Sequence, residues 1–167
     1  FVVEELAEIL AWCRSLPPEG ARTVALVAFS SIIVTVSKQD SDTRYVRRAK
    51  NSAPGETMAR FARALKVAVG AVDEFSGRVR SDLRCDVIEA NVLQQPNSPP
   101  FDLMVCSPPY PNAFSYHLYH MTRMVWLGMD QPRFKREEIG SHRKYSAKGP
   151  NGATAETFQS EMLTILA

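Results

Sequence analysis

The segment Phe101-Asp-Leu-Met-Val-Cys-Ser-Pro-Pro-Tyr110 determines the fold that we expect for this chain. Its first half is a short apolar run with the length and composition of a buried strand. Proline cannot continue a sheet ladder, so the strand is expected to end near Ser107, before Pro108 and Pro109. A hydroxyl, stiff backbone carbonyls and the ring of Tyr110 then stand at the carboxyl end of a strand, where open α/β sheets bind ligands. The segment predicts an α/β fold with a site at this edge.

The motif Ser107-Pro108-Pro109-Tyr110, after an apolar strand that contains Asp102, resembles the catalytic motif of DNA amino-methyltransferases. That motif is an Asp, Asn or Ser followed by Pro-Pro and an aromatic residue. These enzymes transfer a methyl group from S-adenosylmethionine (SAM) to an exocyclic base nitrogen. The Ser form resembles the cytosine-N4 branch more than the adenine-N6 branch, which stays the alternative. The resemblance implies a Rossmann-like SAM-dependent methyltransferase fold, double-stranded DNA as partner, and a setting such as restriction–modification.

The chemistry of the resembled reaction explains the residue types at these four positions. An exocyclic amine conjugated to its ring is a poor nucleophile, because its lone pair is delocalised. Acceptors on its N–H groups, here the Ser107 Oγ and the Pro108 carbonyl, would favour a pyramidal nitrogen whose lone pair points at the sulfonium methyl group. Tyr110 would stack on the flipped-out base. A rigid turn with no catalytic role is the alternative interpretation of Ser-Pro-Pro-Tyr.

Two residues are expected on the cofactor side of the site. Residues 85–91 read as a second strand, and in Rossmann-like methyltransferases a Gly-Asp pair after the preceding strand often contacts the adenine of SAM. Ala90-Asn91 occupies the similar position, and the Asn91 side-chain carbonyl can accept a hydrogen bond from an adenine amino group. Asn91 otherwise simply ends a strand. Cys106 adjoins the motif, but the Pro-Cys pattern of cytosine-C5 enzymes is absent, so its thiol is expected to be a small buried hydrophobe rather than a nucleophile.

Three regions supply candidate contacts to DNA. The helix expected over residues 114–127 follows the motif and would line a flipped-base pocket. Two polar, basic segments, residues 39–56 and 131–151, are expected to be loops whose cations contact phosphates. Solvated surface loops are the alternative for both segments. The residues expected to contact DNA are Asn112, Tyr116, Arg44, Arg47, Arg143 and Lys144.

The remaining elements are expected to be mainly helical. Residues 21–38 are ambiguous, because their β-branched content favours a strand and their length favours a buried helix. A helix is preferred there because similar methyltransferases have one. No apolar run is expected to span a membrane. The expected helices cover residues 2–16, 21–38, 57–75 and 114–127, with a last one beginning at Thr154.

Composition predicts a single domain over residues 1–167 in a reducing, cytoplasmic setting. The net charge of +2 is too small to indicate nucleic acid by itself. Three cysteines without metal-like spacing argue against a disulfide framework. His117 and His120 lie three positions apart, but no third ligand completes a recognisable metal set, so no metal is expected.

One expected feature of such enzymes is not found in the sequence. Methyltransferases of this kind carry a SAM motif resembling Asp/Asn-Pro-Phe-x-Gly-Ser-Gly, and none of the eight glycines lies in such a motif. The chain begins at Phe1 and ends within an expected helix, so we expect an incomplete methyltransferase domain, its catalytic part. The rival from another class is a non-catalytic DNA-binding or assembly module derived from such an enzyme. Oligomeric state stays open.

Overall fold

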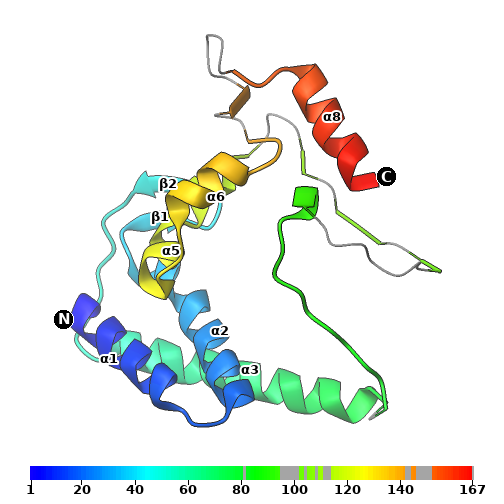
Figure 1. Cartoon of the computed structure of the whole chain (residues 1–167). Coiled ribbons are helices and arrows are strands. Elements are labelled where there is room, and N and C mark those ends of the chain that lie inside the picture. Colours follow the sequence, from blue (N-terminus) through cyan, green and yellow to red (C-terminus); the bar gives the residue numbers. More distant parts are fainter. Residues whose placement is uncertain are drawn as a thin grey trace. The chain divides into compact units, whose positions relative to one another are not determined.

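The computed structural model divides the chain into two compact units, whose helices and strands are labelled in Figure 1. Unit 1 consists of Phe1–Arg84 and Tyr119–Met129, and unit 2 of Cys85–Leu118 and Asp130–Ala167. The structure describes residues 1–80, 82–94, 102–103, 105–107, 109–110, 114–141, 144–145 and 152–166.

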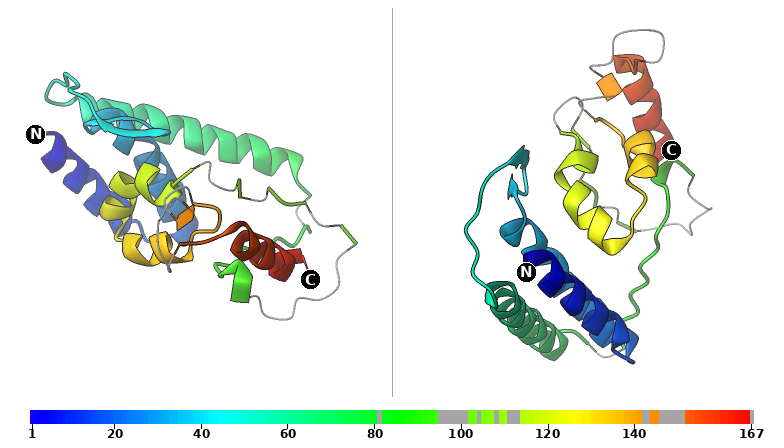
Figure 2. Two further views of the ribbon diagram at one scale, coloured as in Figure 1. Left: turned by 90° about the horizontal axis from the view of Figure 1, so that it is seen from above. Right: turned by 90° about the vertical axis from the view of Figure 1, so that its left-hand side faces the viewer.

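Unit 1 is built on three helices that contact one another, α1 (Val2–Ser15), α2 (Glu19–Val36) and α3 (Glu56–Arg78) (Figure 2). Apolar residues recur along α1 at helical spacing, which creates a stripe that packs into the core. Pro17 and Pro18 follow this helix and prevent its continuation. The core consists of Leu6, Ile9, Leu10, Cys13, Ala25, Ala28, Phe29, Ile32, Ile33, Val36 and Phe61.

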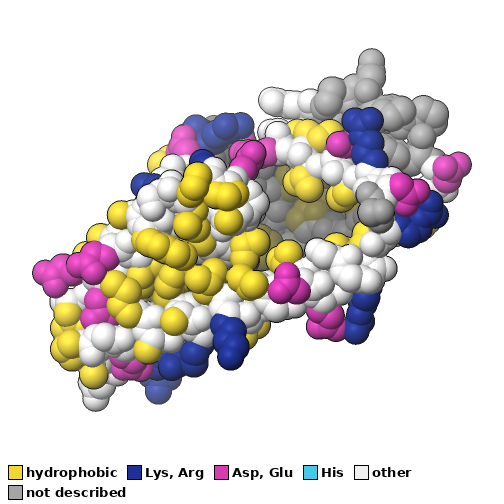
Figure 3. All heavy atoms as spheres, turned by 90° about the horizontal axis from the view of Figure 1, so that it is seen from below, with side chains coloured by type: hydrophobic (Ala, Val, Ile, Leu, Met, Phe, Trp, Pro, Cys, Tyr) yellow, Lys and Arg dark blue, Asp and Glu magenta, His cyan; other side chains and the backbone are white. Residues whose placement is uncertain are grey.

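The ambiguous segment after Pro18 is a helix, α2, and it is the central element of unit 1. Phe29 and Ile33 are fully buried, and burying each such side chain contributes about 1.5–3 kcal/mol. By length and composition alone α2, with a mean hydropathy of 1.5, is long and apolar enough to span a membrane, contrary to the expectation from the sequence. In the structure the buried apolar residues of α2 pack against α1 and α3, whereas its Val27 is exposed. The left part of Figure 3 shows further apolar side chains at the surface of unit 1.

A hairpin and a short helix complete unit 1. Residues expected to be a loop form β1 (Gln39–Ser41) and β2 (Arg44–Arg47), which pair antiparallel. Gln39 is buried, and its side-chain amide donates to the backbone carbonyls of Ser41 (2.8 Å) and Tyr119 (2.9 Å). Its carbonyl oxygen accepts from Thr122 Oγ1 of α5 (Met121–Leu127). The hairpin is thereby fixed to α5.

Unit 2 contains all but the last residue of α4 (Tyr116–Tyr119), together with α6 (Gln131–Glu137), α8 (Ala155–Leu166) and a 3₁₀ turn, η1 (Val92–Gln94). The helix expected over residues 114–127 is divided in two, α4 and α5, at His120.

The two expected strands of unit 2 are not formed in the described residues. Residues 85–91 and the described part of 101–107 have no strand assignment, and Val87 and Val105 are 94% and 87% exposed. A strand needs the hydrogen-bond ladder of a neighbour, and the β1–β2 hairpin is the only sheet that the described part of the chain contains. The Rossmann-like α/β fold therefore stays a prediction.

The start of α3 depends on a carboxylate from α1. Glu5 Oε1 accepts the N–H of Gly55 at 2.6 Å, and Oε2 accepts the N–H of Thr57 at 3.1 Å. These are donors that a helix N-terminus leaves without intrahelical partners, and a negative charge there also complements the helix dipole. The hydrogen bonds, first that from Gly55, lower the pKa of Glu5.

We expect Glu5→Gln to lower the melting temperature of unit 1 at pH 7. Because the folded-state pKa of Glu5 lies below its ordinary value of 4.5, the stabilisation is complete above that value. It is lost as the pH falls through the lower folded-state pKa. Thermal unfolding of the wild type and the variant between pH 7 and pH 3 should show a gap that narrows in acid. The exposed Glu8→Gln serves as control, and a gap independent of pH would contradict the assignment.

Candidate functional site

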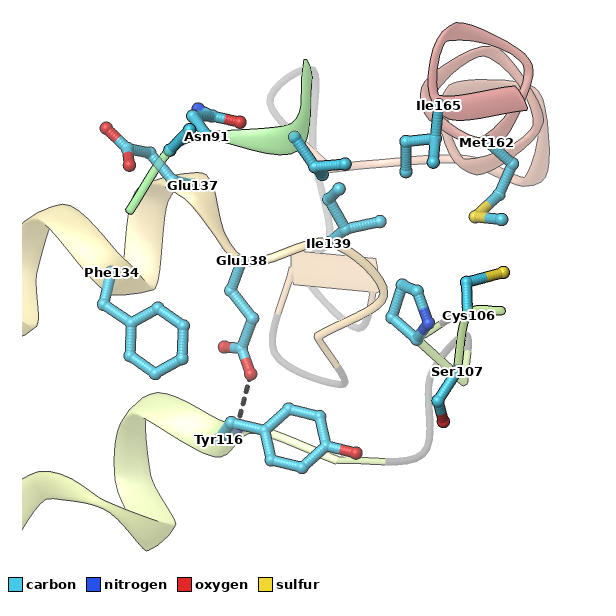
Figure 4. Close-up of a pocket in the computed structure, with 13 residues that line it drawn as sticks. Asn91, Cys106, Ser107, Tyr116, Phe134, Glu137, Glu138, Ile139, Met162 and Ile165 are labelled. Carbon is cyan, nitrogen blue, oxygen red and sulfur yellow. Dashed lines mark hydrogen bonds between the residues drawn. The ribbon is translucent and has the colours of Figure 1, made fainter. Parts of the chain in front are cut away.

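A pocket of about 440 Å³ lies within unit 2, and segments distant in the sequence form its wall (Figure 4). Two of these segments are the residues around η1 and the motif segment with Cys106, Ser107 and Pro109. The others are the start of α4, the end of α6 with the loop that follows it, and α8. The lining residues are Ala90, Asn91, Val92, Cys106, Ser107, Pro109, Tyr116, Phe134, Glu137, Glu138, Ile139, Met162 and Ile165.

Five of the residues predicted from sequence line this one pocket. They are Asn91 and Cys106 from the expected cofactor side, Ser107 and Pro109 from the motif, and Tyr116 from the expected base pocket. Figure 4 shows the Ser107 and Tyr116 side chains on the same side of the cavity. The pocket thus joins residues that the sequence separates by up to 25 positions.

The other predicted residues of the base site are placed differently. Tyr110 is not among the pocket-lining residues, and 61% of its surface is exposed. Cys106, expected to be buried, is exposed, because no strand among the described residues covers its segment. Pro108 and Asn112 lie outside the described residues.

The side chain of Asn91 has a local structural role. Its Oδ1 accepts the N–H of Leu93 at 3.0 Å, and its backbone carbonyl accepts the N–H of Gln94 at 2.9 Å. Asparagine commonly makes such bonds to the backbone two residues ahead, and here they begin η1. The oxygen expected to accept a ligand hydrogen bond therefore already accepts one, with its second lone pair left for another donor.

The most buried polar feature of the site is a carboxylate–imidazole pair that the sequence did not predict. Glu138 follows α6, and its side chain is 3% exposed; the His117 side chain is 1% exposed. His117 Nδ1 lies 2.5 Å from Glu138 Oε2, and the N–H of Tyr116 donates to Glu138 Oε1 at 2.5 Å. The sequence favours ordinary packing or solvent exposure for His117 over a metal site, and the described residues contain no group of three potential metal ligands.

The loop after Glu138 lies directly against Pro109 and the Tyr110 backbone. Gly140 has a φ of +75°, and a Cβ there would stand 3.1 Å from the Tyr110 carbonyl oxygen and 3.4 Å from Pro109 Cβ. Both the backbone conformation and the close approach therefore favour glycine. Ser141 and Ser115 are buried with their hydroxyl oxygens 3.4 Å apart.

The basic residues predicted to contact DNA lie in both units. Arg44 and Arg47 are exposed on β2 of unit 1, and Arg44 forms an ion pair with Asp40 at 3.5 Å. Lys144 of unit 2 forms an ion pair with Glu161 of α8. Arg143 lies outside the described residues.

Lys144 and its neighbour Tyr145 both contact α8. Tyr145 Oη donates to Glu161 Oε2 at 3.3 Å, and the Tyr145 ring packs edge-on against Phe158 with a centroid distance of 6.1 Å. Burial, and then the negative charge of Glu161, raises the pKa of Tyr145 to about 12. Both side chains that were expected on a DNA-facing loop therefore help to hold α8 in unit 2.

Comparison of this chain with protein-family models, with curated proteins and with solved structures found no match. A functional assignment consequently depends on the residues and geometry of the chain itself.

We expect Glu161→Gln to lower the pKa of Tyr145 from about 12 part of the way towards its ordinary value of 10.0, because burial remains and only the nearby charge is removed. Ultraviolet titration of the tyrosines, with Tyr145→Phe to assign the transition, measures the change. Glu156→Gln, which alters an exposed carboxylate of the same helix, should leave the titration as it is. An unchanged Tyr145 transition in Glu161→Gln would show that the carboxylate does not face the phenol.

Proposed function

We propose that this chain is the catalytic part of a SAM-dependent DNA methyltransferase that methylates the exocyclic N4 of cytosine. The observation that supports the proposal most is the shared pocket of unit 2. Ser107, expected to orient the target amine, and Asn91, expected to contact the cofactor, line it together with Tyr116. The resemblance assigns them to the base and to the cofactor, and a methyl transfer requires base and donor in one cavity.

The dimensions and lining of the pocket fit a small-molecule donor. Its volume of about 440 Å³ lies within the range of roughly 300–1,000 Å³ that is usual for ligand pockets. Apolar side chains such as Phe134 and Met162 form much of its wall, with a few polar groups between them, including Asn91 and Glu137. SAM, when bound, supplies an electrophilic methyl group carried on a sulfonium centre.

The residues of the chain would position the base rather than react covalently with it. The Ser107 hydroxyl accepts a hydrogen bond from the exocyclic amine and orients its lone pair. Pro109 stiffens the backbone that carries this hydroxyl. Tyr110, with most of its ring exposed, is available to stack on a base that has left the duplex. Exposed Arg44 and Arg47 suit contacts to phosphates that position DNA without reading its sequence.

We expect Ser107→Ala to reduce methyl transfer to DNA by about 100-fold, the loss typical of removing one group that stabilises a transition state. SAM binding should persist, because the hydroxyl is assigned to the base. Transfer of a labelled methyl group and calorimetric titration with SAM measure the two properties, with Ser160→Ala of α8 as matched control. Wild-type turnover in a folded Ser107→Ala variant would refute the role.

Nucleoside analysis of the methylated DNA tests the proposed product. Detection of N4-methylcytosine would support the proposal. Detection of N6-methyladenine would show that the same site methylates adenine instead. A chain that neither binds SAM nor methylates DNA, yet binds DNA in a salt-sensitive manner, would instead be a non-catalytic module.

We expect Tyr110→Ala to impair methylation while leaving the melting temperature nearly unchanged, because the ring is mostly exposed and is not part of a core. Stacking of a base on an aromatic ring contributes about 1–3 kcal/mol, so the loss should appear in the affinity for the target base. Tyr110→Phe retains the ring and should keep most of the activity. Equal activity of the Ala and Phe variants would exclude a stacking role.

A further inference from the structure

The buried carboxylate of Glu138 connects two segments that carry residues of the site. Its two oxygens are both engaged, one by the backbone N–H of Tyr116 and the other by His117 Nδ1. A carboxylate and an imidazole this deeply buried are stable in the fold only when they are paired, because an unpaired buried charge is costly. The pair therefore fixes the start of α4, and with it Tyr116, to the residue that follows α6.

The same loop contacts the motif two residues later. Gly140 approaches the Tyr110 carbonyl and the Pro109 ring so closely that a Cβ would stand 3.1 Å from the former. Ser141, the next residue, is buried beside Ser115, which precedes Tyr116. Residues 138–141 thus contact both the Pro109–Tyr110 segment and the segment that carries Tyr116.

We infer that the Glu138–His117 pair, acting through residues 138–141, is a positioning device that sets the placement of Tyr110 and Tyr116 relative to each other. The inference rests on the proposed function for its consequence, because the two tyrosines are the rings assigned to the target base. Neither Glu138 nor His117 is required to contact substrate. A displacement of about 1 Å in a positioning group costs on the order of 100-fold in rate, so the pair should matter to turnover.

Two variants disturb the device from opposite ends. Glu138→Gln keeps the shape of the side chain and removes the charge that His117 faces. Gly140→Ala leaves the pair in place and puts a methyl group against the Tyr110 backbone in a strained conformation, so it tests the inference even if Glu138→Gln fails to fold. His117→Asn can still donate from a position close to that of Nδ1, whereas His117→Ala cannot. Glu156→Gln is the control for loss of one carboxylate of unit 2.

The first readout does not depend on enzymatic activity. The chain is labelled with 3-fluorotyrosine, and the ¹⁹F resonances of Tyr110 and Tyr116 are assigned with Tyr→Phe variants. Both resonances should shift in Glu138→Gln and in His117→Ala. In His117→Asn they should lie closer to the wild-type positions than in His117→Ala. The control Glu156→Gln should leave both at the wild-type positions. Gly140→Ala should shift that of Tyr110. Unmoved resonances in folded Glu138→Gln and Gly140→Ala would overturn the inference, whatever the chain catalyses.

The second readout is the kinetics of methyl transfer. We expect Glu138→Gln to lower kcat by about 10–100-fold. Its melting temperature should also fall, because the buried imidazole loses its charged partner. His117→Ala should lower kcat to a similar extent, whereas His117→Asn should retain most of the wild-type kcat. A kcat equal to wild type together with shifted resonances would overturn the catalytic consequence. Shifted resonances in a chain whose wild type methylates nothing would support the positioning device and overturn the proposed function.

Discussion

The constraint on which the site depends is the burial of one carboxylate. Glu138 is almost inaccessible, and removing an ionised group from water is costly unless the surrounding groups compensate for it. Compensation comes from a backbone N–H and an imidazole on the segment that begins α4, so that segment and the end of α6 must meet. The contact of Gly140 with Pro109 and the Tyr110 backbone extends the same connection to the motif. Three stretches of chain thereby converge on one cavity.

Unit 1 depends on a different kind of interaction. Its core is apolar, and its central helix, α2, packs against α1 and α3. Helix α5 contacts α2 through a hydrogen bond and an aromatic contact. Arg123 donates to the Ser30 carbonyl at 3.0 Å, and Trp126 packs edge-on against Phe29 with a centroid distance of 6.1 Å. Hydrophobic packing supplies most of the stabilisation here, since it scales with the apolar area removed from water. Hydrogen bonds select which surfaces meet.

The pocket of unit 2 combines these two kinds of interaction. Apolar residues of α6 and α8 form part of its wall, and the polar groups that methyl transfer would require project among them. The ion pair of Lys144 with Glu161 helps to hold α8, a structural use of a cation that the sequence suggested for DNA. Basic residues in a loop carry the same sequence signature whether they face phosphates or a carboxylate of their own chain. Only spatial neighbours distinguish these uses.

The sequence by itself determined α1 and α3 of unit 1 and the residue types around the pocket. Apolar residues at helical spacing and the breaks at Pro17 and Pro18 are local properties, so α1 and α3 were predicted close to their observed bounds. The composition of α2 did not decide between a strand and a helix. In the structure this segment is a helix that packs against α1 and α3. The Glu138–His117 pair could not be predicted, because its partners lie 21 residues apart and meet only in the tertiary structure. A strand is likewise not a local property, since it forms only where a neighbour supplies its hydrogen-bond ladder.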